Sequence, residues 1–203
     1  MEFFRRAAVH PRKLGVFPGT FNPPTRAHIA VTRAALDEVD EVVFVLPRAF
    51  PHKPYEGAPF EDRVRMLEAA LAGEPNCSIA ASGGGLFLEI ARECREFYGA
   101  GVELCFLCGR DAAERIINWD YGRPGAFLEQ LNEYSLLVAP RRGGYKPAGE
   151  MGSRIRTLCV EPGLDEVSAS AVRDRIASGE PWEHLVPEAV VPLARSIYGE
   201  DRH

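Results

Sequence analysis

Short apolar runs recur along the chain, and segments with apolar residues at helical spacing lie between them. The runs predict strands at 13–17, 41–46, 76–80, 102–107, 135–139 and 154–160. Such unbroken apolar runs are typical of strands that are covered on both faces. The spaced segments predict helices at 26–38, 60–71, 86–98 and 169–178. This alternation predicts an α/β fold, in which an open parallel sheet carries helices on both faces.

Length and composition favour one globular domain that acts on small-molecule substrates. The 203 residues fit a single domain over 1–203, with a core at about 13–178 and a helical tail at about 180–199. A net charge of −5 argues against a nucleic acid or a membrane surface as the partner. No apolar run reaches the roughly 18 residues of a membrane span, and the start MEFFRRAAVHPRK lacks the apolar core of a signal peptide. We therefore expect a cytoplasmic protein, and the oligomeric state stays open.

The five cysteines predict buried thiols rather than a redox or zinc site. They are scattered through apolar segments, where free cysteine is commonly buried. The single C-x-x-C pair is formed by Cys105 and Cys108. A zinc or redox site of this type needs a second pair or a helix start, and neither is present. Free thiols also fit a cytoplasmic location.

The loop after the first predicted strand reads GVFPGTFNPPTRAH over 15–28. Gly19 lets the backbone turn sharply and lets a ligand come close. Thr25 is predicted to cap the next helix, which places His28 in the first turn beside the exposed amides. The amides and the helix dipole attract anions there, so the loop predicts a phosphate site. The same residues are common in ordinary turns, and this alternative stays open for the loop alone.

A second stretch near the end of the chain reads VSASAVR over 167–173. Ser168 is predicted to cap a helix, Ser170 lies in its first turn, and Arg173 follows on the same face. Two hydroxyl groups, amides and a guanidinium at one helix start suit a chain of phosphates. A serine cap with a solvated arginine is the alternative for this stretch alone.

Together, the two stretches resemble the paired signatures of the nucleotidyltransferase superfamily. GTFNPPTRAH is similar to G-x-F-[DN]-P-x-[HT]-x-x-H, and SASAVR is similar to [ST]-x-[ST]-x-x-R. The intervening chain resembles the nicotinate- and nicotinamide-mononucleotide adenylyltransferases in three segments, PHKPYEGAPFEDRVRMLEAAL, FLCGRDAAERIINW and LLVAPRRGG. The resemblance covers residues from about 13 to 178 and implies a Rossmann-like sheet.

The resemblance implies transfer of AMP from ATP to a pyridine mononucleotide, with release of pyrophosphate, in NAD biosynthesis. It implies no protein metal site, because Mg2+ is carried by the triphosphate. His28 and Arg173 would be the catalytic residues. The residues implied for ATP binding are Phe17, Gly19, Thr20, Phe21, Thr25, His28, Gly109, Asp111, Ser168, Ser170 and Arg173. Those implied for the acceptor are Asn22, Lys53 and Trp119.

Several of these roles have ordinary alternatives. Trp119 fits a core or lid aromatic as well as a platform for the pyridine ring. Asp111 fits a helix cap. Lys53, Arg141 and Arg142 fit solvated loop charges.

Two departures from the resemblance leave the acceptor open. Ala27 stands where the first signature usually has glycine. The segment after the third predicted strand reads GGGLFLEIA, whereas the related nicotinate enzymes tend to carry hydroxyl residues that help recognise the ring carboxylate. Leu86, Phe87 and Leu88 cannot hydrogen-bond a polar substituent through their side chains, so only backbone amides of the glycine run are left for that role.

The acceptor is therefore nicotinate mononucleotide, nicotinamide mononucleotide or another phosphorylated compound, such as pantetheine phosphate or a phosphorylated sugar or alcohol. Two further alternatives are a nucleotide-binding protein without turnover and an α/β domain that binds some other phosphate ligand.

Overall fold

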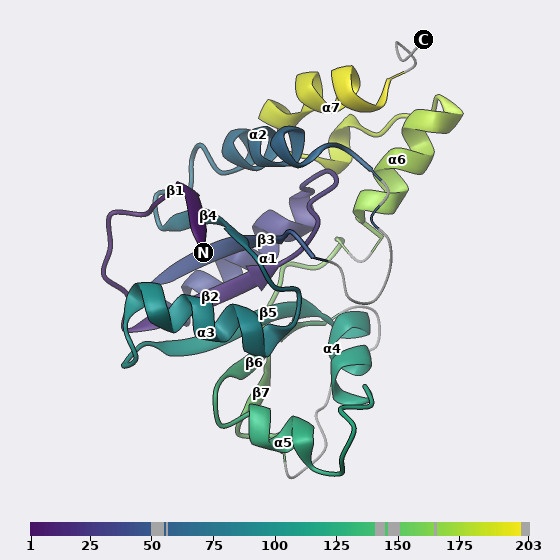
Figure 1. Ribbon diagram of the computed structural model, residues 1–203. Helices are drawn as coiled ribbons and strands as arrows, with labels where there is room; N and C mark the ends of the chain where they lie inside the picture. The colour runs from purple at the N-terminus through teal and green to yellow at the C-terminus, as the bar shows by residue number, and fades with distance from the viewer. Residues whose placement is uncertain (50–54, 56, 141–144, 146–150, 165, 200–203) are drawn as a thin grey trace.

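The computed structural model describes residues 1–49, 55, 57–140, 145, 151–164 and 166–199 (Figure 1). Its sheet has seven strands in the order β1-β4-β3-β2-β5-β6-β7. The strands are β1 Glu2–Arg5, β2 Lys13–Pro18, β3 Glu41–Pro47, β4 Cys77–Ser82, β5 Glu103–Gly109, β6 Ser135–Ala139 and β7 Ile155–Thr157. The antiparallel pair is β1 with β4, and the other pairs are parallel. The predicted parallel α/β sheet is confirmed.

Helices cover both faces of this sheet. The helices of the structure are α1 Arg26–Leu36, α2 Phe60–Ala70, α3 Phe87–Tyr98, α4 Arg110–Ile117, α5 Ala126–Gln130, α6 Ala169–Ser178 and α7 Val191–Tyr198, of which α1 to α5 pack on the sheet. One buried cluster joins β2 and β5 to α3, α4 and α5, and a second joins the other sides of the same strands to α1 and α2. Figure 1 accordingly shows α3 in front of the sheet and α1 behind it.

The chain order creates a switch point beside β2. From β2 the chain moves outward to β3 and β4, and it then returns to the other side of β2 with β5. The connections after β2 and β5 leave for opposite faces, because α1 and α4 belong to opposite clusters. A crevice at the carboxyl ends of the strands forms at such a point, and ligands of open α/β sheets bind there.

The tail after α6 forms a third apolar cluster with α2. It contains two 3-10 turns, Glu183–Leu185 and Glu188–Val190, and then α7. Trp182, Val190 and Ala194 of the tail are buried together with Met66 of α2 and Val172 of α6. The tail therefore packs on α2 and α6, and Figure 1 shows α7 beside α2.

The cysteine prediction holds for four thiols and fails for one. Cys105 and Cys108 of β5 lie in the buried clusters on opposite faces of the sheet, as their spacing along a strand requires, so they cannot share a ligand. Cys77 and Cys94 are also buried, and Cys159 is exposed. Burial raises the pKa of Cys108 to about 12. Within the described residues, no helix is long and apolar enough to cross a bilayer.

Candidate functional site

The loop after β2 turns sharply because one aromatic ring folds beneath it. The Gly19 amide donates to the Val45 carbonyl at 3.0 Å, which ties the loop to β3. Phe21 has a φ of 47°, an uncommon value for a residue with a side chain. A Cβ atom at Gly19 would lie 2.9 Å from Cζ of Phe21, so a side chain at Gly19 would displace the ring. The glycine is therefore required by the fold of the loop itself.

The rings of Phe17 and Phe21 support the loop from below. Phe21 is 2% exposed, and its ring centroid lies 5.5 Å from that of Phe17, 5.1 Å from Phe44 and 5.2 Å from the His28 ring. Buried rings in this position cannot offer their faces to a nucleotide. Contact of Phe17 or Phe21 with ATP would therefore come through the backbone.

Thr25 and His28 occupy the predicted places at the start of α1. Thr25 is the N-cap and His28 is the third helical residue. The Thr25 amide donates to Nδ1 of His28 at 2.9 Å, and the Thr25 hydroxyl lies at the same distance from Nδ1. A backbone N–H can only donate, so in the neutral ring Nδ1 is the acceptor and Nε2 carries the proton. The cap thus prepares His28 as a donor through Nε2.

Asn22 holds the loop to the neighbouring segments. Its side chain is 3% exposed, and its Oδ1 accepts from the Ala58 amide at 3.1 Å and from the Tyr198 hydroxyl at 2.5 Å. Because Oδ1 has two partners within the chain, contact with the acceptor would fall to other atoms of Asn22.

Arg63 of α2 also supports the loop, and sequence reasoning missed it. Its side chain is buried, and Nη1 donates to the Thr20 carbonyl at 3.2 Å. The guanidinium carbon lies 4.3 Å from the centre of the Tyr55 ring, and burial lowers the pKa of Arg63. Arg63 follows Phe60 by three residues and lies on the apolar face of its helix. A charged residue on an apolar helix face is the sequence feature that could have identified Arg63.

The second signature meets the first in space. Ser168 caps α6, with its hydroxyl accepting from the Ala171 amide at 3.1 Å. Arg173 donates through Nη1 to the Asn22 carbonyl at 2.5 Å and through Nη2 to Ser170 Oγ at 3.3 Å. These bonds use two of the five N–H groups of the guanidinium. Within the part of the chain that the structure describes, the other three have no hydrogen-bond partner.

The exit of β5 carries the remaining predicted residues. Gly109 ends β5 and is the N-cap of α4, and a Cβ atom there would meet nothing within 4 Å. Asp111 lies in the first turn of α4 and is exposed, so it is not the N-cap. Trp119 is 49% exposed and lines a hollow of about 510 Å³ with Tyr121 and Phe127. Trp119 is therefore not a core aromatic. The predictions for Lys53, Arg141 and Arg142 lie outside the described residues.

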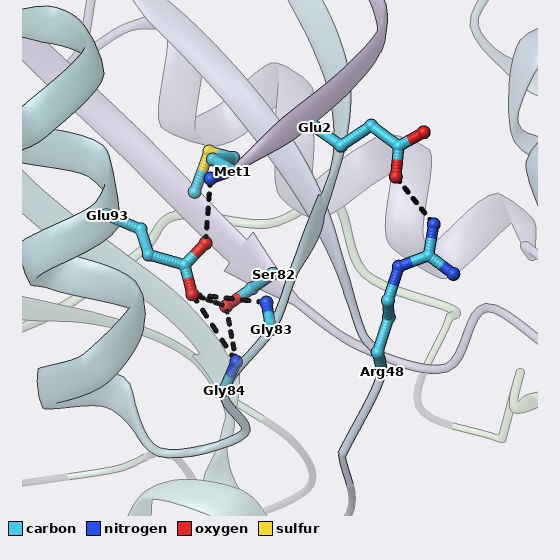
Figure 2. A network of polar contacts seen from close by, with 7 residues as sticks. All are labelled: Met1, Glu2, Arg48, Ser82, Gly83, Gly84 and Glu93. Carbon is cyan, nitrogen blue, oxygen red and sulfur yellow. Dashed lines mark hydrogen bonds and ion pairs between the residues drawn. The ribbon is translucent and has the colours of Figure 1, made fainter.

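The backbone amides of the loop after β4 donate hydrogen bonds to carboxylates of α3. Glu93 Oε1 accepts from the Ser82 hydroxyl at 2.6 Å and from the amides of Gly83 and Gly84 at 3.1 and 3.3 Å (Figure 2). Its Oε2 pairs with the Met1 amino group at 3.1 Å. Burial alone raises the pKa of Glu93, but the bonds from Ser82, Met1 and Gly84 outweigh it and lower the pKa.

The next two amides of this loop have the same kind of partner. Gly85 and Leu86 both donate to Glu89 Oε2 at 3.0 Å. The four successive amides of 83–86 therefore all donate to glutamate side chains. This geometry does not support recognition of an acceptor carboxylate by the backbone of the glycine run.

A larger hollow lies away from these residues. It measures about 900 Å³ and is lined by the outer side of α1, the segment 159–164 and the 3-10 turns of the tail. Of the predicted site residues that the structure describes, none lines it. Its size reflects an open groove between the tail and α1, whereas the two signatures meet at the carboxyl ends of β2 and β3.

The sequence profile of the Cytidylyltransferase-like family matches residues 16–175, which include both signatures. A "probable nicotinate-nucleotide adenylyltransferase" from Rubrobacter xylanophilus is 32% identical over 206 residues, which cover 93% of each chain. The chain belongs to the nicotinate-nucleotide adenylyltransferase family of cytidylyltransferase-like enzymes.

Further relatives agree with this membership. The Geobacillus kaustophilus protein with the same name is 30% identical over 88% of this chain and 81% of its own. The solved structure of nicotinic acid mononucleotide adenylyltransferase from Plasmodium falciparum, complexed with NaAD, superposes with a TM-score of 0.68 over 91% of this chain and 95% of that one. Its sequence identity is 14%, so that likeness concerns the fold. As a member of this family, the protein is a nucleotidyltransferase.

Proposed function

We propose that this enzyme transfers the adenylyl group of ATP to the phosphate of a pyridine mononucleotide and releases pyrophosphate, as a step of NAD biosynthesis. The observation that carries the proposal is the bond from Arg173 to the Asn22 carbonyl. It joins two signatures that are 151 residues apart in the sequence at one end of the sheet. The names of the sequence relatives support the adenylyl chemistry.

In the proposed reaction, an oxygen of the acceptor phosphate attacks the α-phosphorus of ATP. A new P–O bond forms as the bond from the α-phosphorus to the bridging oxygen breaks, and pyrophosphate leaves with the electron pair. No protein nucleophile is needed, so the chain has to align the two substrates and stabilise negative charge on the leaving group. Mg2+ would bind the triphosphate, whose oxygens are the hard ligands that it prefers.

We assign the charge stabilisation to His28 and Arg173. His28 would donate from Nε2 to a phosphate oxygen while its Nδ1 stays bound to the Thr25 amide. Arg173 would use its remaining N–H groups on the leaving phosphates, together with Ser170. Donors that are already oriented need no rearrangement as charge develops, and this makes them effective in the transition state.

The remaining assignments follow the places that these residues have in the fold. Gly19 and Thr20 would line the triphosphate through the backbone of the loop after β2. Gly109 and Asp111 would border the adenosine at the exit of β5, where a Cβ atom on Gly109 would face open space. Trp119 is exposed and would stack on the pyridine ring.

Which pyridine acceptor is used depends on the ring substituent. The relatives are named for nicotinate. In this chain the amides of 83–86 are bound to Glu89 and Glu93, which places negative charge beside that loop. This arrangement disfavours a ring carboxylate at the loop and is compatible with the uncharged carboxamide of nicotinamide. A preference for nicotinate would mean that donors elsewhere in the site read the carboxylate.

The test is a product assay by mass spectrometry. The purified protein, ATP and Mg2+ are incubated separately with nicotinate mononucleotide, nicotinamide mononucleotide and pantetheine phosphate. We expect a dinucleotide and pyrophosphate from at least one pyridine acceptor, and none from the His28→Ala variant above a small residual rate. Product from pantetheine phosphate alone would replace the pyridine assignment. ATP binding without pyrophosphate from any of the three acceptors would refute this reaction.

A further inference from the structure

The C-terminal helix reaches the phosphate loop of the first signature. Tyr198 is the last residue of α7 and lies beyond residues 16–175, which carry the family match. Its hydroxyl lies 2.5 Å from Oδ1 of Asn22, which is 176 residues earlier in the sequence. Asn22 directly follows the strained turn at Phe21. A segment outside the family match thus contacts the loop of the first signature.

The hydroxyl of Tyr198 is a fixed donor. Burial raises the pKa of Tyr198, so the phenol stays protonated through the neutral range. The Asn22 oxygen is an acceptor, and its other partner is the Ala58 amide at 3.1 Å. A backbone N–H and a phenol on the same oxygen also fix which way the Asn22 amide group faces. Asn22 therefore has one side-chain orientation that satisfies both partners.

Asn22 links this donor to the arginine of the second signature. The Asn22 carbonyl accepts from Nη1 of Arg173, and Nη2 of Arg173 binds Ser170 Oγ. The position of the guanidinium is therefore set by the backbone of Asn22, whose side chain is held by Tyr198. Tyr198, Asn22 and Arg173 form one hydrogen-bonded chain from α7 to the signatures.

We propose that Tyr198 is a positioning residue, which holds Asn22 so that Arg173 faces the phosphates of the nucleotide. The proposal rests on the proposed function only in placing the triphosphate at Arg173. It gives the tail a role in the reaction beyond covering α2. The phenol touches no substrate in this scheme, and its effect passes through Asn22.

The structure offers a matched control for this proposal. Tyr134 is 2% exposed, and its hydroxyl donates to the side-chain oxygen of Gln130 at 2.9 Å, between α5 and β6. Tyr198→Phe and Tyr134→Phe each remove one phenol oxygen and one bond to an amide oxygen. Burial raises the pKa of both phenols, so both are donors in the native protein. A purely structural bond would therefore give similar results in the two variants.

The experiment measures binding, turnover and stability in both variants. Calorimetry gives the Kd of ATP with Mg2+, steady-state assays give kcat/KM for ATP, and thermal unfolding gives Tm. We expect Tyr198→Phe to weaken ATP binding and to lower kcat/KM, each by about tenfold, because a small displacement of a charge-stabilising group has effects of this order or larger. Tyr134→Phe should leave both within about twofold, with a comparable change of Tm.

A double mutant tests the path through Arg173. In the Arg173→Lys background, Tyr198→Phe should lose most of its effect on ATP binding, because the guanidinium that it orients is gone. An equal loss in both backgrounds would overturn the proposal, as would wild-type ATP binding in Tyr198→Phe. The ATP Kd needs no acceptor. A wild-type protein that binds ATP but makes no dinucleotide would therefore refute the proposed function and still leave the role of Tyr198 testable.

Discussion

The two nitrogens of His28 have separate tasks in this structure, and two substitutions separate them. Nδ1 accepts from the Thr25 amide at 2.9 Å, and Nε2 carries the proton that we assign to the phosphates. In His28→Asn the side-chain oxygen comes near the position of Nδ1, and no group replaces Nε2. In His28→Gln the terminal amide nitrogen comes near Nε2, and the acceptor for Thr25 is lost.

The expected sizes follow from these bonds. Loss of a capping hydrogen bond costs about 1 kcal/mol of unfolding free energy. For a chain of this length that lowers Tm by about 2 to 4 °C. Loss of one donor to the transition state lowers kcat by about 100- to 1,000-fold. His28→Asn should therefore have the wild-type Tm and a kcat that is lower by about 100- to 1,000-fold. His28→Gln should have a Tm that is lower by about 2 to 4 °C and a kcat within about tenfold of the wild type.

Pyrophosphate release and thermal unfolding give the two measurements on the same samples. The wild type and His28→Ala are the two controls, because His28→Ala lacks both the acceptor for the Thr25 amide and the donor at Nε2. A His28→Asn variant with wild-type kcat would refute the assignment of Nε2 as the donor. A His28→Gln variant with an unchanged Tm would refute the contribution of the cap.

Three further predictions concern the acceptor and the thiols. Trp119→Ala should raise the KM of the pyridine acceptor about three- to tenfold through the lost stacking, with little change of Tm because the ring is 49% exposed; an unchanged KM would leave Trp119 as a surface aromatic. Glu89→Gln keeps an acceptor for the amides of Gly85 and Leu86 but removes the charge. It should shift the ratio of kcat/KM values about two- to fivefold toward nicotinate mononucleotide, and an unaltered ratio would show that this loop does not face the ring. Iodoacetamide at pH 8 should label the exposed Cys159 and leave three buried thiols unlabelled in the native protein, because thiols with a pKa of about 12 are ionised to roughly one part in 10,000 there. Those thiols are Cys77, Cys94 and Cys108. Peptide mass spectrometry reads the labels, and rapid labelling of any of the three would contradict their burial.

Local patterns predicted most of the strands and helices, with differing accuracy in their bounds. The predicted strand at 135–139 and the predicted helix at 169–178 have the observed bounds. The predicted strand at 154–160 is shorter, at 155–157. The strand β1, with the sequence EFFR, was missed because four residues carry little pattern and it forms by antiparallel pairing with β4. Helices α4 and α5 were missed because they are short and follow glycine directly.

The candidate site was predicted in part, where it depends on residues that are close in the sequence. Thr25, His28 and Ser168 have the predicted helix positions because capping depends on a few consecutive residues. The buried ring of Phe21 packs against Phe44, which lies on β3. The bond between Arg173 and Asn22 likewise joins residues that are distant in the sequence. The occupied amides of 83–86 depend on where α3 places two glutamates.

The sequence by itself determined the parallel α/β fold, because this follows from short-range periodicity, and its two signatures indicated the family by resemblance. Only the tertiary structure decided how the signatures are held. Arg63 of α2 reaches the Thr20 carbonyl, and Tyr198 of α7 reaches the side-chain oxygen of Asn22, because the third apolar cluster packs α7 against α2. The physical reason is that a hydrogen bond between residues far apart in the chain depends on the packing of whole elements, and no local pattern in the sequence records it.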